Sequence, residues 1–349
     1  MKDEKIKPQQ KLSSKEPLIT KEKYDNVWKV IFSVLLIFSF IGIFFMIKNV
    51  KQFRNTLKSY NPSYELPKFS DFTISIPLFI LISLIKYIVL KYLVNFCSRI
   101  MKKSYRFPTN EKDRILGERY KYKLPDHMFK GFSYLFLTLF GYYVLKDLNY
   151  FPKDLLGKGS LSNIYIKGYP NSFYLEKPPL FNFYYMLCLA YFSSDAVWLI
   201  FINAKQSDFI NMFLHHICTI SLIIFSYLVN YSNVGAIVLF LHVETDIFSH
   251  LLRFSIQIEC PDFFKVASAF ALLFNFLYFR LYTFGKLIYV LYYYITWKST
   301  IDSCLLFFLI IIFSMHVNWT LMLSQKIGAY FRRGEIKDTR EFKVNAKQP

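Results

Sequence analysis

Two adjacent histidines, His215 and His216, lie well inside a hydrophobic segment that is long enough to cross a membrane. His242 and Asp246 lie inside the next such segment. An ionisable side chain at that depth is costly, and such residues commonly mark a functional site. Imidazole transfers protons near neutral pH, and a neighbouring carboxylate can orient the ring and stabilise its cation. These residue types therefore indicate an intramembrane site for acid–base or nucleophilic chemistry.

The spacing of the polar residues predicts two helix faces that line one cleft open to the cytosol. The two stripes are Asp208, Asn211, His215 and Thr219 in the first segment, and His242, Asp246, Ser249, His250 and Arg253 in the second. His216 points about 100° away from His215, because consecutive residues do not share a helix face. The adjacent pair is thus unsuited to chelating a metal side by side, and no ligand pattern typical of zinc accompanies it, so we expect no metal site.

Two further segments carry ionisable residues at a similar depth. At 1.5 Å per residue, His215 and Asp246 lie about 10 Å from one edge of the membrane. Asp195 in the preceding segment and His316 in the last lie about 12 to 13 Å from the same edge. Four segments thus contribute ionisable groups to one layer, although a single membrane histidine often serves only to hydrogen-bond neighbouring helices.

Long apolar runs separated by lysine-rich connectors determine the predicted fold class. Hydrophobic residues make up 54% of the 349 residues, and aromatic residues make up 20%. Eight runs approach or exceed the ~17 to 25 residues that cross a bilayer. They cover residues 30–47, 72–96, 129–147, 182–203, 209–229, 233–252, 263–293 and 301–325. We therefore predict an all-α, multi-pass transmembrane helical bundle, whose first span stays as an anchor because no signal-peptide cleavage site follows it.

The formal net charge of +19 is distributed unevenly between the two sides of this bundle. With both termini on one side, that side holds 27 Lys and Arg residues and the other holds 11. This bias predicts that both tails face the cytosol. Topology and attraction to anionic membrane lipids explain the basic excess, so we expect no nucleic-acid partner. The five cysteines stand singly, without the spacing of a disulfide framework.

A motif in residues 205–253 resembles the signature region of the ceramide synthases, the acyl-CoA-dependent sphingoid-base N-acyltransferases of the TLC-domain family. The motif begins as His-His-x-x-Thr and continues into the next span, with His215, His216, Thr219, His242 and Asp246. The resemblance extends to residues 168–170 in a connector, 183–186 in the fourth span, 276–280 in the seventh, and His316 and Trp319 in the last. It covers about residues 120–335.

This resemblance implies a TLC-domain-like fold, an activity and a location. The activity is transfer of a fatty acyl group from acyl-CoA to the amine of a sphingoid base, with acyl-CoA as co-substrate and no other cofactor. The location is the membrane of the endoplasmic reticulum, among membrane lipids, as a homodimer or a heterodimer. The expected parts are a cytosolic tail (1–29), two accessory transmembrane helices with a basic cytosolic loop (30–119), a TLC domain of six transmembrane helices (120–335) and a second cytosolic tail (336–349).

The same resemblance assigns roles to the polar residues. We expect four catalytic residues, of which a histidine is the general base or the nucleophile: His215, His216, His242 and Asp246. We expect the substrates to contact seven others: Asp195, Thr219, His250, Arg253, Arg280, His316 and Trp319.

The second histidine block departs from the family's pattern, since Ser249, His250 and Arg253 stand where the family has Leu-Glu and a Lys. Where the family has an Asp directly after the histidine of its second block, this chain has Val243. Glu244 follows, but it points ~200° from His242 and is not a direct substitute. Two other functions stay open from the sequence. One is a non-catalytic TLC-domain protein that senses lipid or associates with a translocon, and the other is a proton-coupled transporter, which the lack of repeat symmetry disfavours.

Overall fold

The computed structural model describes residues 18–165, 174, 177–202, 208–258, 260–294 and 299–333. Over these ranges the chain is helical apart from short connectors and two isolated β-bridges. Eight of the helical segments in this part of the chain are long and apolar enough to cross a membrane, and they coincide with the eight predicted spans. The predicted all-α multi-pass bundle is therefore confirmed.

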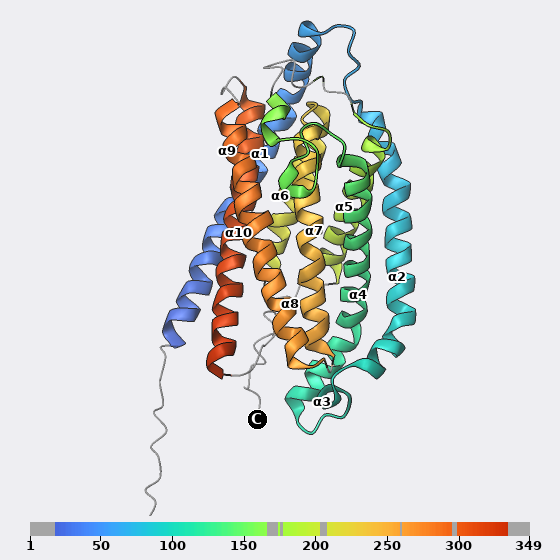
Figure 1. Ribbon diagram of the computed structural model, residues 1–349, viewed down its shortest axis with the longest axis vertical. Helices are drawn as coiled ribbons and strands as arrows, with labels where there is room; N and C mark the ends of the chain where they lie inside the picture. The colour runs from blue at the N-terminus through green and yellow to red at the C-terminus, as the bar shows by residue number, and fades with distance from the viewer. Residues whose placement is uncertain are drawn as a thin grey trace, which may run out of the picture.

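The spans follow one another along the chain as labelled in Figure 1. The first three are α1 (Leu18–Tyr60), α2 (Ser75–Ile100) and α4 (Glu111–Leu145), with the short α3 (Lys103–Arg106) before α4. The next three are α5 (Phe181–Phe201), α6 (Phe209–Leu228) and α7 (Ser232–Gln257). The seventh combines α8 (Asp262–Asn275), a π-helical segment (Phe276–Thr283) and α9 (Phe284–Tyr294), and the eighth is α10 (Thr300–Arg333). The connectors hold the 3-10 helices η1 (Phe69–Ile74), η2 (Lys153–Leu155) and η3 (Leu161–Tyr165).

Helix α1 continues beyond the end predicted at residue 47. The extra turns resemble a connector in sequence because they carry lysine, arginine and asparagine. Val50, Phe53 and Leu57 nevertheless recur at helical spacing, and all three are buried in the main core. The predicted connector at 48–71 is therefore wrong over its first part. Mean hydropathy is high only where a helix faces lipid on most sides, but an amphipathic helix needs only one apolar stripe to pack against its neighbours.

Helix α4 begins at Glu111, well before the start predicted at residue 129. Asn110 caps it, since its side chain accepts a hydrogen bond from the backbone NH of Asp113 at 2.8 Å. The early turns pack against the end of α2 in a small core formed by Cys97, Met101, Leu116, Tyr120 and Leu124. The basic stretch at 99–123 is therefore helical over much of its length, because its apolar residues have a partner to pack on.

Helices α6 and α7 stand in the middle of the bundle, and the other spans surround them (Figure 1). Helix α6 packs on α1, α5 and α10, whereas α7 packs on α4 and α8, and α2 lies at the edge against α4 and α5. The start of α1, helix α3 and the end of α10 lie at one end of the bundle, named the α3 end below (Figure 1). The first span begins and the last span ends at the same end of the bundle because the number of spans is even.

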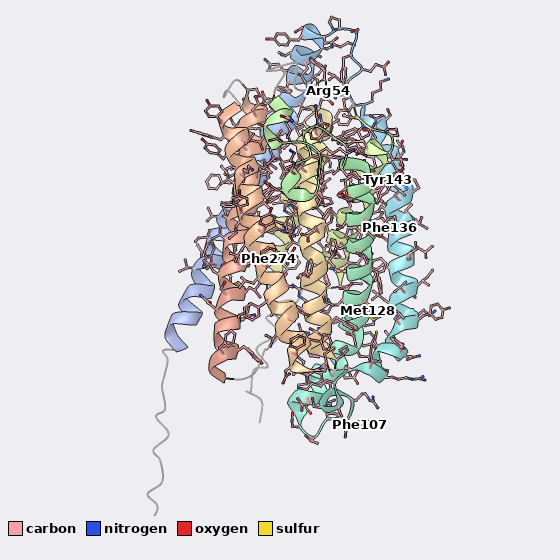
Figure 2. The ribbon with its side chains drawn as sticks, viewed as in Figure 1. Arg54, Phe107, Met128, Phe136, Tyr143 and Phe274 are labelled. Carbon is pink, nitrogen blue, oxygen red and sulfur yellow. The ribbon has the colours of Figure 1, made fainter. Side chains whose placement is uncertain are left out.

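Apolar side chains project outward along the length of the bundle (Figure 2). Phe136 and Tyr143 on α4 and Phe274 on α8 are each more than half exposed. Contiguous exposed apolar surface of this kind is typical of a membrane-facing protein. A group of polar side chains, among them Asp195, His215, His216 and His242, is instead buried between the helices.

Candidate active site

A polar cavity of about 170 Å³ lies near the α3 end, between α4, α5, α6, α7, α8 and α10. Eight of the eleven predicted site residues line it: Asp195, His215, His216, Asp246, His250, Arg253, Arg280 and Trp319. Asp208 and Asn211 of the first predicted stripe and Ser249 of the second also line it. Side chains far apart in the sequence thus converge on one space, and the two stripes form facing walls.

The remaining three predicted residues lie elsewhere. Thr219 and His242 line a second, apolar cavity. His316 lines neither cavity; it is fully buried and bonded to Arg280. The stripes therefore extend past the polar cavity in the direction away from the α3 end.

Three imidazole rings form a continuous row across the centre of the bundle. The ring centroids of His215 and His242 lie 5.8 Å apart in a stacked arrangement, and those of His242 and His316 lie 4.9 Å apart. Trp319 meets His215 edge-on at 5.5 Å, and His216 lies 5.7 Å from His215 on the other side. Helices α6, α7 and α10 each supply one histidine of this row, so their packing determines its geometry.

Arg280 holds one side of the row in place. It lies in the π-helical segment, a rare conformation that is frequent at functional sites, and it is 1% exposed. Its guanidinium donates hydrogen bonds of 2.8 Å to His316 Nε2, to the backbone carbonyl of His242 and to Asp246 Oδ1. The sequence assigned Arg280 and His316 to substrate binding, but the structure engages both with neighbouring protein groups. Asp246, the partner of Arg280, stays 22% exposed at the cavity wall.

The hydrogen bonds fix the proton positions of two histidines. Because guanidinium can only donate, His316 accepts at Nε2 and is a neutral ring protonated at Nδ1. His242 Nδ1 lies 2.7 Å from the Val238 carbonyl, which can only accept, so neutral His242 carries its proton there. Its Nε2 atom has no hydrogen-bond partner among the described residues. The Nε2 atom of neutral His242 is therefore unprotonated and can accept a proton in the middle of the histidine row.

Asp195 connects His216 to charged residues that the sequence reasoning did not combine. Its Oδ2 lies 3.7 Å from His216 Nε2. Its Oδ1 lies 3.1 Å from the ammonium of Lys86 on α2 and 2.7 Å from that of Lys130 on α4. Asp126 completes this group with a contact of 3.2 Å to Lys86. The available signal was a lysine inside each of two apolar spans, since such a lysine needs an intramembrane partner.

His250 has a partner that the sequence did not reveal. Its Nδ1 lies 3.2 Å from Nδ1 of His127 on α4, so one ring donates and the other accepts. Tyr134 stacks on His250 with ring centroids 5.5 Å apart. His250 is thus fixed at the cavity wall by α4. His127 lies before the predicted third span, which explains why it was not considered.

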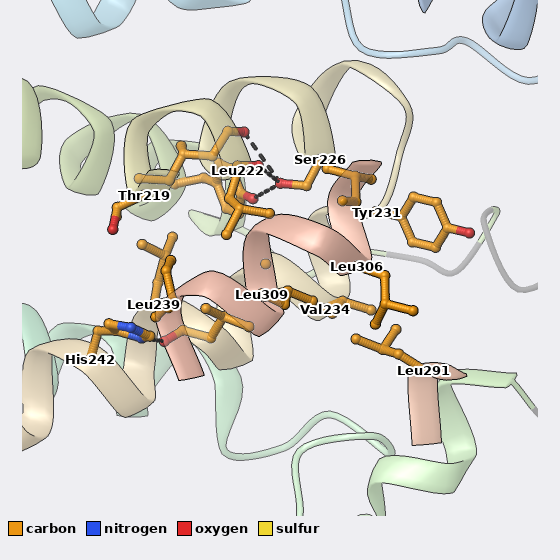
Figure 3. A pocket seen from close by; sticks show the side chains of 16 residues that line it. Thr219, Leu222, Ser226, Tyr231, Val234, Leu239, His242, Leu291, Leu306 and Leu309 are labelled. Carbon is orange, nitrogen blue, oxygen red and sulfur yellow. Dashed lines mark hydrogen bonds between the residues drawn. The ribbon is translucent and has the colours of Figure 1, made fainter. Parts of the chain in front are cut away.

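The apolar cavity continues from the histidine row along α6 and α7, with a volume of about 50 Å³. Its lining is mainly aliphatic: Leu222, Ile223, Val234, Val238, Leu239, Leu291, Leu305, Leu306, Leu309 and Ile312, with Thr219, Tyr185, Ser226, Tyr231, Gly235 and His242. Figure 3 shows Thr219 and His242 at one end and Tyr231 at the other. The Tyr231 hydroxyl donates to Asp302 at 2.9 Å, which satisfies a polar group at the far end.

Val243, the position that departs from the family pattern, is fully buried in the main apolar core. It lines neither of the two cavities. A carboxylate introduced there, as in Val243→Asp, would enter apolar packing rather than the histidine site. Among the described residues, no group of three or more His, Cys, Asp or Glu side chains could hold a metal ion.

Several predicted features lie outside the described residues. They are residues 168–170 and the start of the 205–253 motif, which belong to the resemblance, and most of the two terminal tails. Their expected roles stay predictions.

Comparison with known families identifies the bundle that carries both cavities. The family model described as the TLC domain matches residues 123–325. The chain belongs to the TLC-domain family. All eleven predicted site residues fall within the match, whereas α1 and α2 precede it. The match begins inside α4, as does the predicted start of the domain at residue 120.

Curated relatives of this TLC-domain protein carry related names. Ceramide synthase 4 of Homo sapiens is 29% identical over 183 residues, which cover 49% of this chain and 44% of that protein. Ceramide synthase LOH2 of Arabidopsis thaliana is 33% identical over 85 residues, 24% of this chain and 28% of that protein. Sphingosine N-acyltransferase lag1 of Schizosaccharomyces pombe is 26% identical over 159 residues, 45% and 37% respectively. The chain thus spans less than half the length of each of these relatives.

Proposed function

We propose that this protein is an N-acyltransferase that moves a fatty acyl group from acyl-CoA to the amine of a sphingoid base. The observation that carries the proposal is the succession of two cavities along α6 and α7, one polar and one apolar, with the histidine row between them. A fatty thioester has the same division, with a charged carrier, a reactive carbonyl and an apolar chain. The named relatives support the same reaction class.

The two cavities suggest how the substrates bind. The acyl chain enters at the apolar cavity, whose aliphatic side chains must move apart to admit it, because a space of about 50 Å³ holds only a small part of a fatty chain. The thioester then lies beside His215 and His242, and the CoA moiety extends through the polar cavity toward the α3 end. Arg253 and Lys326 line that cavity and supply positive charge for a polyanionic carrier.

The chemistry is proton transfer combined with acyl transfer. A sphingoid-base ammonium has a pKa near ~10, by analogy with an alkyl amine, and must lose a proton before it attacks. The ammonium first releases this proton to solvent. As the amine nitrogen then forms a bond to the thioester carbon, a neutral imidazole accepts a second proton from that nitrogen, and the C–S bond breaks. The imidazolium then returns its proton to the CoA thiolate. The products are an N-acyl sphingoid base and CoA with a free thiol.

A covalent variant of this reaction is the alternative. His215 or His216 attacks the thioester and CoA leaves, so that the amine resolves an acyl-imidazole in a second step. Neutral His242, with its bare Nε2 beside His215, fits the role of base in either route. Asp246 and Asp195 would stabilise the positive charge that develops on the imidazoles.

The direct test is an assay of the purified full-length protein in lipid vesicles. We expect mass spectrometry to detect the N-acyl product from a sphingoid base and at least one acyl-CoA, and no product from the double variant His215→Ala/His216→Ala at equal protein level. A wild-type protein that stays inactive across acyl-CoA lengths from medium to very long would reject the proposal and favour a non-catalytic TLC-domain protein.

We further propose that the protein resides in the endoplasmic reticulum with both termini in the cytosol. The α3 end, where α1 begins and α10 ends, also holds the basic stretch at 99–123. Tags at both termini should therefore be cleaved by protease added to intact microsomes. Protection of either tag would contradict this orientation.

A further inference from the structure

Helix α2 is an unexpected place for a buried charge. It stands at the edge of the bundle and precedes the TLC domain. Only two of its residues are buried, Lys86 and Cys97. Lys86 lies near the middle of the helix and is 2% exposed, so its ammonium does not reach the membrane surface. Burying that charge in a span requires specific partners.

Four side chains surround the Lys86 ammonium. The nearest carboxylate oxygens are Asp195 Oδ1 at 3.1 Å and Asp126 Oδ1 at 3.2 Å. The ring centroids of Trp198 and Phe129 lie 4.9 Å and 5.9 Å away. Three elements, α2, α4 and α5, therefore meet at this one nitrogen, and the aromatic faces shield it from lipid.

Lys130 balances the network. Its ammonium lies 2.7 Å from Asp195 Oδ1 and 3.8 Å from Asp126 Oδ2. Two ammonium groups thus face two carboxylates, so the formal charges cancel. Asp195 is the more buried carboxylate, at 6% exposed. Lys130 approaches it more closely than it approaches Asp126, and Lys86 lies at nearly the same distance from both.

The network ends at the histidine site. Asp195 lines the polar cavity, and its Oδ2 faces His216 Nε2 at 3.7 Å. A network that only joined α2 to the bundle could end at Asp126, which also contacts both lysines. Contacts to Asp195 instead restrain the carboxylate that faces His216.

We propose that Lys86 is a positioning residue for the histidine site: it fixes the Asp195 carboxylate, and Asp195 in turn sets the orientation of His216. This inference rests on the proposed N-acyltransferase function. Helix α2 then supports the active site although it lies outside the TLC domain. Because an error of about 1 Å in the position of a catalytic group can reduce the rate ~100-fold, a residue two contacts away can control turnover.

The test is a double-mutant cycle on the full-length protein in lipid vesicles, with kcat and KM measured for both substrates. We expect Lys86→Met to lower kcat ~10-fold or more, while each KM changes less than ~3-fold. Lys86→Arg should recover most of the lost kcat. Lys86→Met/Asp195→Asn should be no slower than Asp195→Asn alone, because the two residues act through one contact.

Two further variants separate positioning from structure. Lys91→Met removes the same charge from an exposed position on α2 and should keep the wild-type kcat. Lys86→Met/Asp126→Asn restores charge balance and retains the pair of Lys130 with Asp195, so it should fold and yet stay slow. This variant is informative even where Lys86→Met alone gives no folded protein.

Three results would overturn the proposal. They are wild-type kcat in Lys86→Met/Asp126→Asn, losses that multiply in the cycle, and failure of the charge-balanced variant to fold, which would assign Lys86 to the fold alone. An inactive wild-type protein would instead reject the proposed function, so the two failures are distinguishable.

Discussion

The polar and apolar cavities are lined by the same two helices and have almost opposite chemistry. Toward the α3 end, α6 and α7 present His215, Asp246 and Arg253. One turn past His215 and Asp246, at Thr219 and His242, the faces turn apolar and present leucine, isoleucine and valine. Because of the helical period, the side chains that line both cavities lie along one continuous face of each helix. The change of residue type along that face separates the polar cavity from the apolar one.

This difference indicates two kinds of sensitivity to mutation. Groups of the polar cavity hold one another: Arg280 is bonded to Asp246 and His316, and Asp195 contacts Lys130 and His216. Removing one group leaves its partners buried and unpaired. Apart from His242 at its end, the apolar cavity contributes mainly volume. Substitutions in the polar cavity should therefore change the rate, and substitutions of the aliphatic residues of the apolar cavity should change which acyl chain fits.

The largest expected effect is at the boundary between the cavities. His215→Ala should lower kcat/KM for N-acylation at least ~100-fold, because it removes the imidazole that acts as the nucleophile or lies beside the base His242. Cys218→Ala is the matched control, since Cys218 is buried on the same helix, contacts Ser39 of α1 and lines neither cavity. Near-normal turnover of a well-expressed His215→Ala protein would show that His215 has no catalytic role.

A smaller effect is expected inside the apolar cavity. Val238→Phe adds bulk to its wall and should reduce the rate with the longest accepted acyl-CoA ~10-fold relative to a shorter one, because part of the chain loses its space. Competition between two acyl-CoA lengths in one assay measures this ratio directly. Ile310→Phe is the control, since Ile310 is about half exposed on α10 and lines neither cavity. An unchanged ratio in Val238→Phe would place the acyl chain elsewhere.

The smallest expected effect concerns Lys177, a partly buried cation in the connector before α5. Lys177 donates to the neutral amide of Asn230 at 2.9 Å, in contrast to Lys86 with its two carboxylates. Burial lowers the pKa of the Lys177 ammonium to about 8, against the partly opposing field of Asp71. The unfolded chain, with a pKa of 10.5, then binds more protons than the folded one between these two values, so stability should rise with pH over that window.

Thermal unfolding in detergent at pH 7 and pH 9.5 tests this expectation. The wild-type protein should gain stability on the order of 1 kcal/mol relative to Lys177→Met between these pH values. If the stability of both proteins changed equally with pH, Lys177 would not be desolvated in the folded protein. The expected difference between Lys177, with its neutral partner, and Lys86, with its two carboxylates, would then be wrong.

The sequence by itself determined the bundle and the direction of its polar faces. Eight apolar runs require eight spans, because a lipid-exposed backbone must satisfy its own hydrogen bonds in helices. The period of 3.6 residues placed His215 with Asp208 and Asn211, and Asp246 with Ser249 and His250, on the faces that line the polar cavity. Helix ends were less predictable, since polar turns such as those around Val50 and Leu116 continue where a tertiary partner buries one side.

Only the tertiary structure decided which side chains meet. A stripe gives the direction of a side chain but does not specify the neighbouring helix that closes over each turn. For this reason the sequence placed Thr219 and His242 in the polar cleft, whereas packing against α10 encloses them in the apolar cavity. Lys86, Asp126 and Asp195 come from three helices, and Arg280 meets Asp246 and His316 from two others, so their contacts depend on how the helices pack. Those contacts determine which buried charges have partners, and the pairing cannot be inferred from the local sequence.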